Sequence, residues 1–272
     1  MRKLILTAAL AGLCMAAAAQ DLVILHTNDT HSHIDPVRSG EYAGLGGVIE
    51  RAAYVDSVRA AMGRNRVLLV DAGDFSQGTS YFTLMKGDVE TACMNAMRYD
   101  VACLGNHEFD NGLDELARRI ESLDFPVVCA NYDFDHEKLG KLVKPWCILR
   151  RGGFRIGVIG VLTDLTVVVD RKIADKMKYL DPVETVSKYA DFLKNRKECD
   201  LVICLSHLGY EGDFFTDPEL VAGVENVDMV IGGHSHTFLE KAEMVRDRSG
   251  KEVPVVTDGC WGLYIGKITL GE

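Results

Sequence analysis

The chain has 272 residues, of which 47% are hydrophobic and 26% are charged, and its formal net charge is −10. This composition is typical of a folded globular protein and excludes an intrinsically disordered chain. The acidic balance, with no segment in which Lys and Arg cluster, argues against a protein that binds a nucleic-acid polymer through its phosphates.

The first residues have the pattern of a secretory signal peptide. Arg2 and Lys3 precede an apolar stretch that ends in a run of alanines, as in segments that are cleaved on export. A membrane anchor is the weaker alternative, because this stretch is shorter than the roughly 20 apolar residues of a spanning helix. We therefore expect residues 1–19 to be a signal peptide, residues 20–272 to be the mature domain, and the protein to be secreted or periplasmic.

Short runs of Val, Ile and Leu alternate with segments of helical periodicity along the rest of the chain. This alternation is the pattern of an α/β protein. Because the runs are apolar at nearly every position, we expect strands that are covered on both faces. The predicted strands are residues 22–25, 67–70, 101–104, 126–130, 156–162, 201–205 and 229–232.

Three of the intervening segments carry apolar residues at helical spacing, namely 48–62, 113–123 and 183–193. Each predicts a helix that can cover one face of a sheet. Glycine-containing turns within 148–158 and 245–256 predict two β-hairpins, so the sheet structure should be mixed. No long repeat or Pro/Ser-rich linker divides the mature chain, and we expect one domain.

Seven cysteines follow the predicted signal peptide, and most of them lie inside apolar runs. None forms a Cys-x-x-Cys pair with another, so a thiolate zinc site is not expected. Buried free thiols are the simpler interpretation, and a disulfide stays open.

Polar residues follow five of the predicted strands at the point where each strand ends. In open α/β sheets the carboxyl ends of the strands form the edge at which ligands bind. Any one of these residues has a structural interpretation, such as capping a turn or packing. Their repeated placement instead favours a metal site formed by Asp29, His31, Asp74, Asn106, His207, His234 and His236.

The mixture of imidazole and carboxylate ligands indicates which metals fit. It suits zinc, manganese, iron or cobalt better than it suits calcium, which prefers oxygen ligands only. Seven ligands exceed the needs of one tetrahedral ion. They suffice for two divalent ions that share a carboxylate, so we predict a binuclear site.

Five motifs resemble, in sequence and in order, those of the calcineurin-like metallophosphoesterases, and within them the catalytic domain of secreted 5′-nucleotidases. The motifs are TNDTH (27–31), AGDFSQG (72–78), GNHEFD (105–110), SHLG (206–209) and GGHSH (232–236). The late stretch 258–270 resembles the strand that closes the family's catalytic domain. The resemblance implies two mixed β-sheets flanked by helices, and metal-dependent hydrolysis of phosphate monoesters, above all 5′-nucleotides.

The resemblance also implies a role for each motif residue. One metal ion would be held by Asp29, His31, Asp74 and His236, and the other by Asp74, Asn106, His207 and His234, so that Asp74 bridges them. Some nucleotidases have Gln where His236 stands here. A hydroxide held by the two ions would attack the phosphate, while His107 protonates or stabilises the leaving oxygen and Asp110 orients His107.

The neighbouring residues have less direct roles. We expect Glu108 to support its loop and Asn111 to cap the helix that begins at Gly112. Structural or packing roles are expected for the remaining histidines and for the aromatic residues that follow strands, namely His26, His33, His136, Phe214, Phe215 and Trp261.

Other functions stay open at this point. A phosphodiesterase, a nucleotide-sugar pyrophosphatase or a related sulfur-ester hydrolase would use the same metals. A metal-binding regulatory protein is the alternative that is not an enzyme, but such a protein has no need of the His107–Asp110 pair.

The family's secreted nucleotidases usually continue into a second, substrate-binding domain, whereas this sequence ends at Glu272. We therefore expect that domain to be absent, and nucleotide recognition to need a separately encoded protein that supplies it.

Overall fold

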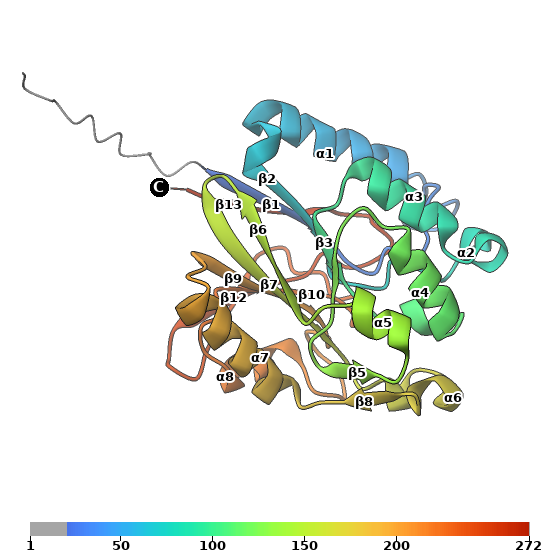
Figure 1. The fold of residues 1–272 in the computed structure, drawn as a ribbon. Coiled ribbons are helices and arrows are strands. Elements are labelled where there is room, and N and C mark those ends of the chain that lie inside the picture. The colour runs from blue at the N-terminus through green and yellow to red at the C-terminus, as the bar shows by residue number, and fades with distance from the viewer. Residues whose placement is uncertain (1–20, 272) are drawn as a thin grey trace, which may run out of the picture.

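The computed structural model describes residues 21–271, so the predicted signal peptide lies outside the described residues. Two β-sheets lie against each other, and helices cover both outer faces (Figure 1). The predicted fold class, an α/β sandwich of two mixed sheets flanked by helices, is confirmed.

The strands and helices follow one another in an order that alternates for most of the chain. The strands are β1 (Leu22–Thr27), β2 (Val67–Asp71), β3 (Val101–Cys103), β4 (Val127–Val128), β5 (Tyr132–Phe134), β6 (Trp146–Arg151), β7 (Phe154–Leu162), β8 (Met177–Tyr179), β9 (Leu201–His207), β10 (Met229–Gly232), β11 (Glu243–Arg246), β12 (Glu252–Val256) and β13 (Gly266–Leu270). The α-helices are α1 (Val48–Met62), α2 (Ser80–Met85), α3 (Asp88–Met97), α4 (Leu113–Glu121), α5 (Glu137–Leu142), α6 (Arg171–Ala174), α7 (Pro182–Asp191) and α8 (Asp217–Gly223).

The first sheet has the strand order β13-β1-β2-β3-β4, and the second has the order β11-β12-β10-β9-β7-β6. Inner strands are parallel, whereas β13, β11 and β6 pair antiparallel with their neighbours. The hairpins β6–β7 and β11–β12 and the closing strand β13 agree with the predictions. A short antiparallel ribbon, β5–β8, was not predicted.

The core forms between the two sheets and under the helices. Along β1, Leu22 and Ile24 face the second sheet, whereas Val23 and Leu25 face the helices, and all four are buried. This alternation explains why the strand is apolar at every position, since successive side chains enter two different parts of the core.

The helices divide between the outer faces of the sandwich. Residues of α1 and α3 pack on the first sheet, and residues of α7 and α8 pack on the second. Helix α7 begins at Pro182, and the side chain of Asp181 caps it by accepting a hydrogen bond of 2.8 Å from the backbone N–H of Glu184. Pro at the first helical position and Asp before it are both favourable at a helix start.

The predicted cap of α4 was wrong. Gly112 occupies the N-cap position with φ 83°, and no side chain caps this helix. Because glycine takes the left-handed conformation here, Asn111 lies one residue outside the position from which it would cap. Asp114 and Glu115 in the first turn instead place negative charge at the helix N-terminus, where the helix dipole favours it.

All seven cysteines in residues 21–271 are free. Within the same residues, no helix has the length and hydropathy that a membrane crossing requires.

Candidate metal centre

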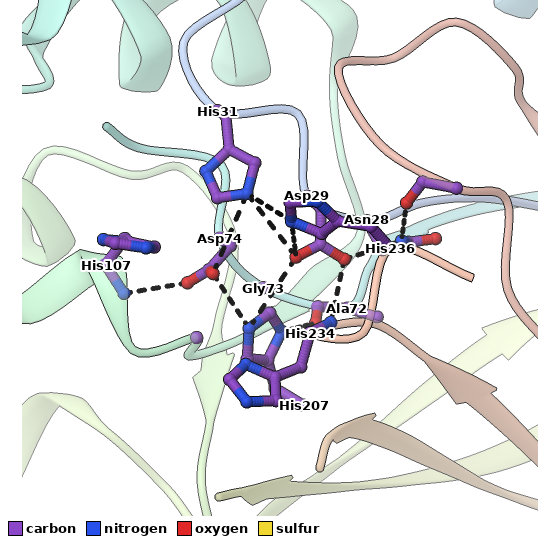
Figure 2. Close-up of polar contacts among 12 residues, drawn as sticks. Asn28, Asp29, His31, Ala72, Gly73, Asp74, His107, His207, His234 and His236 are labelled. Atoms are coloured by element: carbon purple, nitrogen blue, oxygen red, sulfur yellow. Dashed lines mark hydrogen bonds and ion pairs between the residues drawn. The ribbon is translucent and has the colours of Figure 1, made fainter. Parts of the chain in front are cut away.

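The predicted metal ligands meet at the carboxyl ends of β1, β2, β3, β9 and β10 (Figure 2). Three groups of side chains each place their ligand atoms within 4.8 Å of one another: Asp29, His31 and His236; His31, Asp74 and His107; and Asp74, His207 and His234. Six of the seven predicted ligands therefore converge from four separate segments. Asn106, in a fifth segment, directly precedes His107 and is buried.

The backbone at these positions is strained. Five of the seven predicted ligands have a positive φ, in the left-handed region. The values are 48° at Asp29, 44° at His31, 54° at Asp74, 76° at His234 and 54° at His236. This conformation is unfavourable for residues with a Cβ atom and persists only where the surrounding structure imposes it. Its concentration here indicates that the loops are shaped to direct side chains inward.

Two glycines allow the loops to approach one another. A Cβ atom on Gly105 would lie 2.2 Å from Asp74 Oδ1, and one on Gly233 would lie 2.9 Å from Asp29 Oδ2. The close approach of the backbone therefore requires glycine at both positions.

Asp29 is completely buried, and its two carboxylate oxygens have different surroundings. Oδ2 accepts hydrogen bonds from Asn28 Nδ2 at 2.7 Å and from the backbone N–H of His234 at 2.9 Å. Oδ1 has no hydrogen-bond partner and lies 3.4 Å from His236 Nε2 and 3.7 Å from His31 Nε2. One oxygen is thus held by the protein while the other faces the histidines.

Asp74 lies between the two sets of histidines. Its Oδ1 accepts a hydrogen bond of 2.8 Å from the backbone N–H of His107. Its Oδ2 is 3.1 Å from His207 Nε2 and 4.0 Å from His31 Nε2. Asp29 Oδ1 also lies near His207 Nε2, at 3.9 Å, but Asp74 is the closer of the two carboxylates to His207.

The orientation of His207 follows from its partner on the far side of the ring. Its Nδ1 lies 2.7 Å from the carbonyl oxygen of Ala72, and because a carbonyl only accepts, Nδ1 carries the hydrogen. When Nε2 loses its hydrogen, as metal binding requires, its lone pair points to the region between the carboxylates of Asp29 and Asp74. This is the tautomer and the orientation of a histidine that binds a metal.

The charges of the site perturb the pKa values of its histidines. Burial lowers the pKa of His207, but the carboxylate of Asp74 outweighs burial and raises it to about 10. The nearby carboxylate of Asp29 raises the pKa of His236 to about 10, whereas burial and the charge of His207 lower the pKa of His234 to about 4. Protons on His207 and His236 thus compensate for the negative charge of the buried carboxylates. A metal cation that bound here would displace these protons.

Unpartnered atoms show that the residues fit a metal. Asp29 Oδ1 and Asn106 Oδ1 are both buried without a hydrogen-bond partner, a state that costs free energy unless another group satisfies the atom. His31 Nε2 and His236 Nε2 are 2.8 Å apart and aim at the same region. Carboxylate, amide and imidazole donors at these spacings suit divalent transition metals.

His107 and Asp110 lie beside this cluster at its exposed rim. His107 Nδ1 donates to Asp110 Oδ2 at 2.9 Å, and about a third of the His107 side chain is exposed. Burial lowers the pKa of His107, but the hydrogen bond to Asp110 outweighs it and raises the pKa above its usual value. The ring centroid of His107 is 5.4 Å from that of His31.

Glu108 supports the ligand loops, as predicted. Its buried carboxylate accepts hydrogen bonds from the backbone N–H groups of Asp74 at 2.9 Å, Ser76 at 3.1 Å and Gly105 at 2.7 Å. Burial, together with the charge of Asp74, raises the pKa of Glu108 to about 7. The loop after β2 and the loop after β3 are thereby joined through one side chain.

Two residues of the site were missed from the sequence. Arg119 on α4 is buried and donates to Ser76 Oγ at 2.5 Å and to the carbonyl oxygen of Glu108. No signal predicted this burial, because an arginine on a helix is expected at the surface. The second missed residue is Asn28, which donates a hydrogen bond to Asp29 Oδ2. Its position in the TNDTH motif is the only feature of the sequence that could have indicated this role.

The remaining histidines have the structural roles that were expected. His136 caps α5 by accepting from the backbone N–H of Leu139 at 3.2 Å, and His26 is buried beneath Asp258. His33 bonds through Nδ1 to the carbonyl oxygen of His31 at 2.9 Å and stacks on Trp261. Of the two phenylalanines, Phe215 packs against the core, whereas Phe214 is about half exposed.

The chain matches the family described as "Calcineurin-like phosphoesterase" over residues 22–238. Together with the strand-end cluster, this match shows that the chain belongs to the calcineurin-like phosphoesterases. It is a metallophosphoesterase by family, and the predicted resemblance is confirmed.

Its relatives include several 5′-nucleotidases. The snake venom 5′-nucleotidase of Gloydius brevicauda is 34% identical over 96% of this chain and 47% of its own length. The structure of a 5′-nucleotidase precursor from Thermus thermophilus is 36% identical with a TM-score of 0.83, over 92% of this chain and 51% of that one. The NAD nucleotidase of Haemophilus influenzae is 28% identical with a TM-score of 0.81, over 92% and 47%. The chain thus spans about half the length of these relatives.

Replacement of Glu108 by Gln should destabilise the metal-free protein. Gln has a single acceptor oxygen, so its NH₂ group would face a backbone N–H that now bonds to the carboxylate. We expect a loss of about 1–3 kcal/mol in the free energy of unfolding, measured by urea denaturation. Glu121→Gln is the control, since Glu121 forms only a surface ion pair with Lys138 and should change stability by less than about 1 kcal/mol. Equal effects would contradict the supporting role.

Proposed function

We propose that this chain is a binuclear metallophosphohydrolase that removes phosphate from small phosphate monoesters, with 5′-nucleotides as the preferred class. The observation that carries the proposal is the position of Asp74 between two histidine groups, with the His107–Asp110 pair beside them. The similarity to 5′-nucleotidases supports the choice of substrate class.

The residues divide into two ligand sets that share Asp74. One divalent ion would be held by Asp29, His31, Asp74 and His236, and the other by Asp74, Asn106, His207 and His234. Zinc, manganese, iron and cobalt all suit this donor set. When bound, the ions would neutralise the phosphoryl oxygens and lower the pKa of water to near neutrality.

His107 would act on the leaving group. Its Nδ1–H is engaged by Asp110, so Nε2 is the nitrogen that can hold a proton toward substrate. The raised pKa of His107 favours the charged ring, which can donate that proton to an alkoxide oxygen as the ester bond breaks. Asp110 would fix the ring orientation and stabilise its charge.

A pyrophosphate or nucleotide-sugar substrate is the second candidate, because the fold also resembles that of an NAD nucleotidase. The same metals and the same proton donor would serve a phosphodiester or a phosphoanhydride. A panel of nucleoside monophosphates, cyclic nucleotides, NAD and nucleotide sugars, assayed with added Mn²⁺ or Zn²⁺, tests the proposal. Absence of turnover on every member, with metals bound, would favour a regulatory metal-binding protein.

The purified chain should bind about two transition-metal ions. Asp74→Asn should weaken both sites, because Asp74 is the one ligand that the two sets share, whereas His31→Ala should weaken chiefly one. Elemental analysis and isothermal titration with Mn²⁺ measure the stoichiometry. A folded protein that saturates with one ion would contradict the binuclear assignment.

His107→Ala should keep its metals and lose roughly 10²- to 10⁴-fold in kcat on alkyl phosphates, the usual contribution of general acid catalysis. An aryl phosphate should lose less, because its leaving group needs little protonation. His136→Ala serves as the control, since His136 only caps α5. A leaving-group role is excluded if alkyl and aryl esters lose activity equally.

The isolated chain should show little preference for a nucleoside monophosphate over an aryl phosphate. Arg119 and Arg51, two cations close to the ligand loops, are buried beneath them, so they cannot reach a substrate, and specificity needs contacts realised in the transition state. Comparison of kcat/KM for the two substrates measures the preference. A strong preference without a partner would show that these residues suffice.

A further inference from the structure

A small polar cavity lies beneath the loop that carries Asp29 and His31. Its volume is about 20 Å³, and it lies between α1, α3 and that loop. Besides Tyr99, five of the residues that line it carry polar side chains and are more than nine-tenths buried: Thr30, Ser32, Arg51, Asp71 and Glu90. Three of these, Ser32, Arg51 and Glu90, have side-chain atoms without a hydrogen-bond partner. None of the three belongs to the predicted ligand sets or to the His107–Asp110 pair.

Glu90 is the most unusual of these residues. It lies in the first turn of α3, is 3% exposed, and neither of its carboxylate oxygens has a hydrogen-bond partner. A buried carboxylate without partners is strongly unfavourable. Since Glu90 lines the cavity, the missing partners must come from there.

Arg51 on α1 has a matching deficit. Its Nη2 donates to the carbonyl oxygen of His33 at 3.2 Å, but Nε and Nη1 have no partner. The hydroxyl of Ser32 is also buried without a partner. Glu90 and Arg51 therefore line the same cavity with opposite charges, yet no direct hydrogen bond joins them.

We propose that this cavity is a binding site for one ordered water molecule that joins Glu90, Arg51 and Ser32. A cavity needs about 10–15 Å³ to hold one water, so 20 Å³ is enough for one water molecule. Water can donate to the carboxylate, accept from the guanidinium and bond to the hydroxyl at the same time, which makes the usual three hydrogen bonds. Asp71 also lines the cavity, but its two oxygens already accept hydrogen bonds from Thr27 Oγ1 and from the backbone N–H of Gly73.

The water site also positions the ligand loop. Ser32 and His33 directly follow His31, and Ser32 donates its backbone N–H to Phe75, in the loop of Asp74. Arg51 holds the carbonyl of His33, and the water ties Arg51 to Glu90. Helices α1 and α3 thus brace the segment from which His31 projects. This positioning role rests on the proposed function, since it concerns the metal that His31 would bind.

A crystal structure of the whole chain at a resolution that shows waters tests the site itself. We expect one ordered water within hydrogen-bond distance of Glu90, Arg51 and Ser32. A dry cavity, or a direct Arg51–Glu90 ion pair that fills it, would overturn the proposal.

Mn²⁺ titration followed by electron paramagnetic resonance and calorimetry tests the positioning role. Glu90→Gln should weaken one of the two Mn²⁺ sites about 10- to 100-fold, the usual effect of an outer-shell change, and leave the other unchanged. Glu50→Gln is the matched control, because it removes the same charge from an exposed position of α1, and it should change neither site. Equal weakening of both sites, or of neither, would refute the positioning role.

A second variant covers the case in which Glu90→Gln does not fold. Ser32→Ala removes one partner of the water without removing a charge, and it should weaken the same Mn²⁺ site by a smaller factor; no change would count against the role. If the wild-type chain binds no metal at all, the proposed function and the positioning role both fail. The water site is still decided by the crystal structure.

Discussion

Two carboxylates buried at the edge of two β-sheets impose the main constraint on this molecule. Asp29 and Asp74 are 0% and 2% exposed, and a buried charge is tolerated only where other charges and hydrogen-bond donors compensate for it. Four histidines, the backbone N–H groups of His107 and His234 and the side-chain amide of Asn28 compensate for these two charges. The burial of these carboxylates also explains the left-handed backbone of the loops, because side chains from the ends of five strands must converge on a small volume.

The same arrangement explains why the fold was largely predictable from the sequence, whereas the buried charged residues that hold the strand-end loops were not. Strands with apolar residues on both faces, such as β1 and β9, are evident in the sequence, because two core layers require them. The ribbon β5–β8 was missed because its three-residue strands, YDF and MKY, contain charged residues and do not form apolar runs. Asn111 failed as a cap because Gly112 took the cap position. The sequence did predict the site residues Asp29 and Asp74 and the histidines, because a polar residue directly after an apolar strand is easy to recognise.

Arg119, Arg51 and Glu90 could not have been predicted by such reasoning. Charged residues on helices are assigned to the surface, and only tertiary contacts reverse that assignment. All three lie on helices that cover the first sheet, with their charged ends directed toward the loops that this sheet supports. Their burial makes sense only once the strand-end loops are in place, because those loops supply the carbonyl groups, hydroxyls and cavity that receive them.

Different charged residues face the site and support the loops behind it. Carboxylates and imidazoles face the site, whereas Arg119 and Arg51 lie behind the loops and bond to backbone oxygens and a hydroxyl. An arginine that faced the site would compete with the metal ions for Asp29 and Asp74, since guanidinium pairs strongly with carboxylate. Cations placed behind the loops neutralise the buried acidic groups of the support without entering the coordination volume. Under the proposed function, attraction of an anionic substrate would fall to the metals and to the rim, where the hydrogen bond to Asp110 raises the pKa of His107. The residues that hold the loops in place are therefore different from His107, the residue that would transfer a proton. The loops can stay fixed while His107, at the exposed rim, gains or loses its proton.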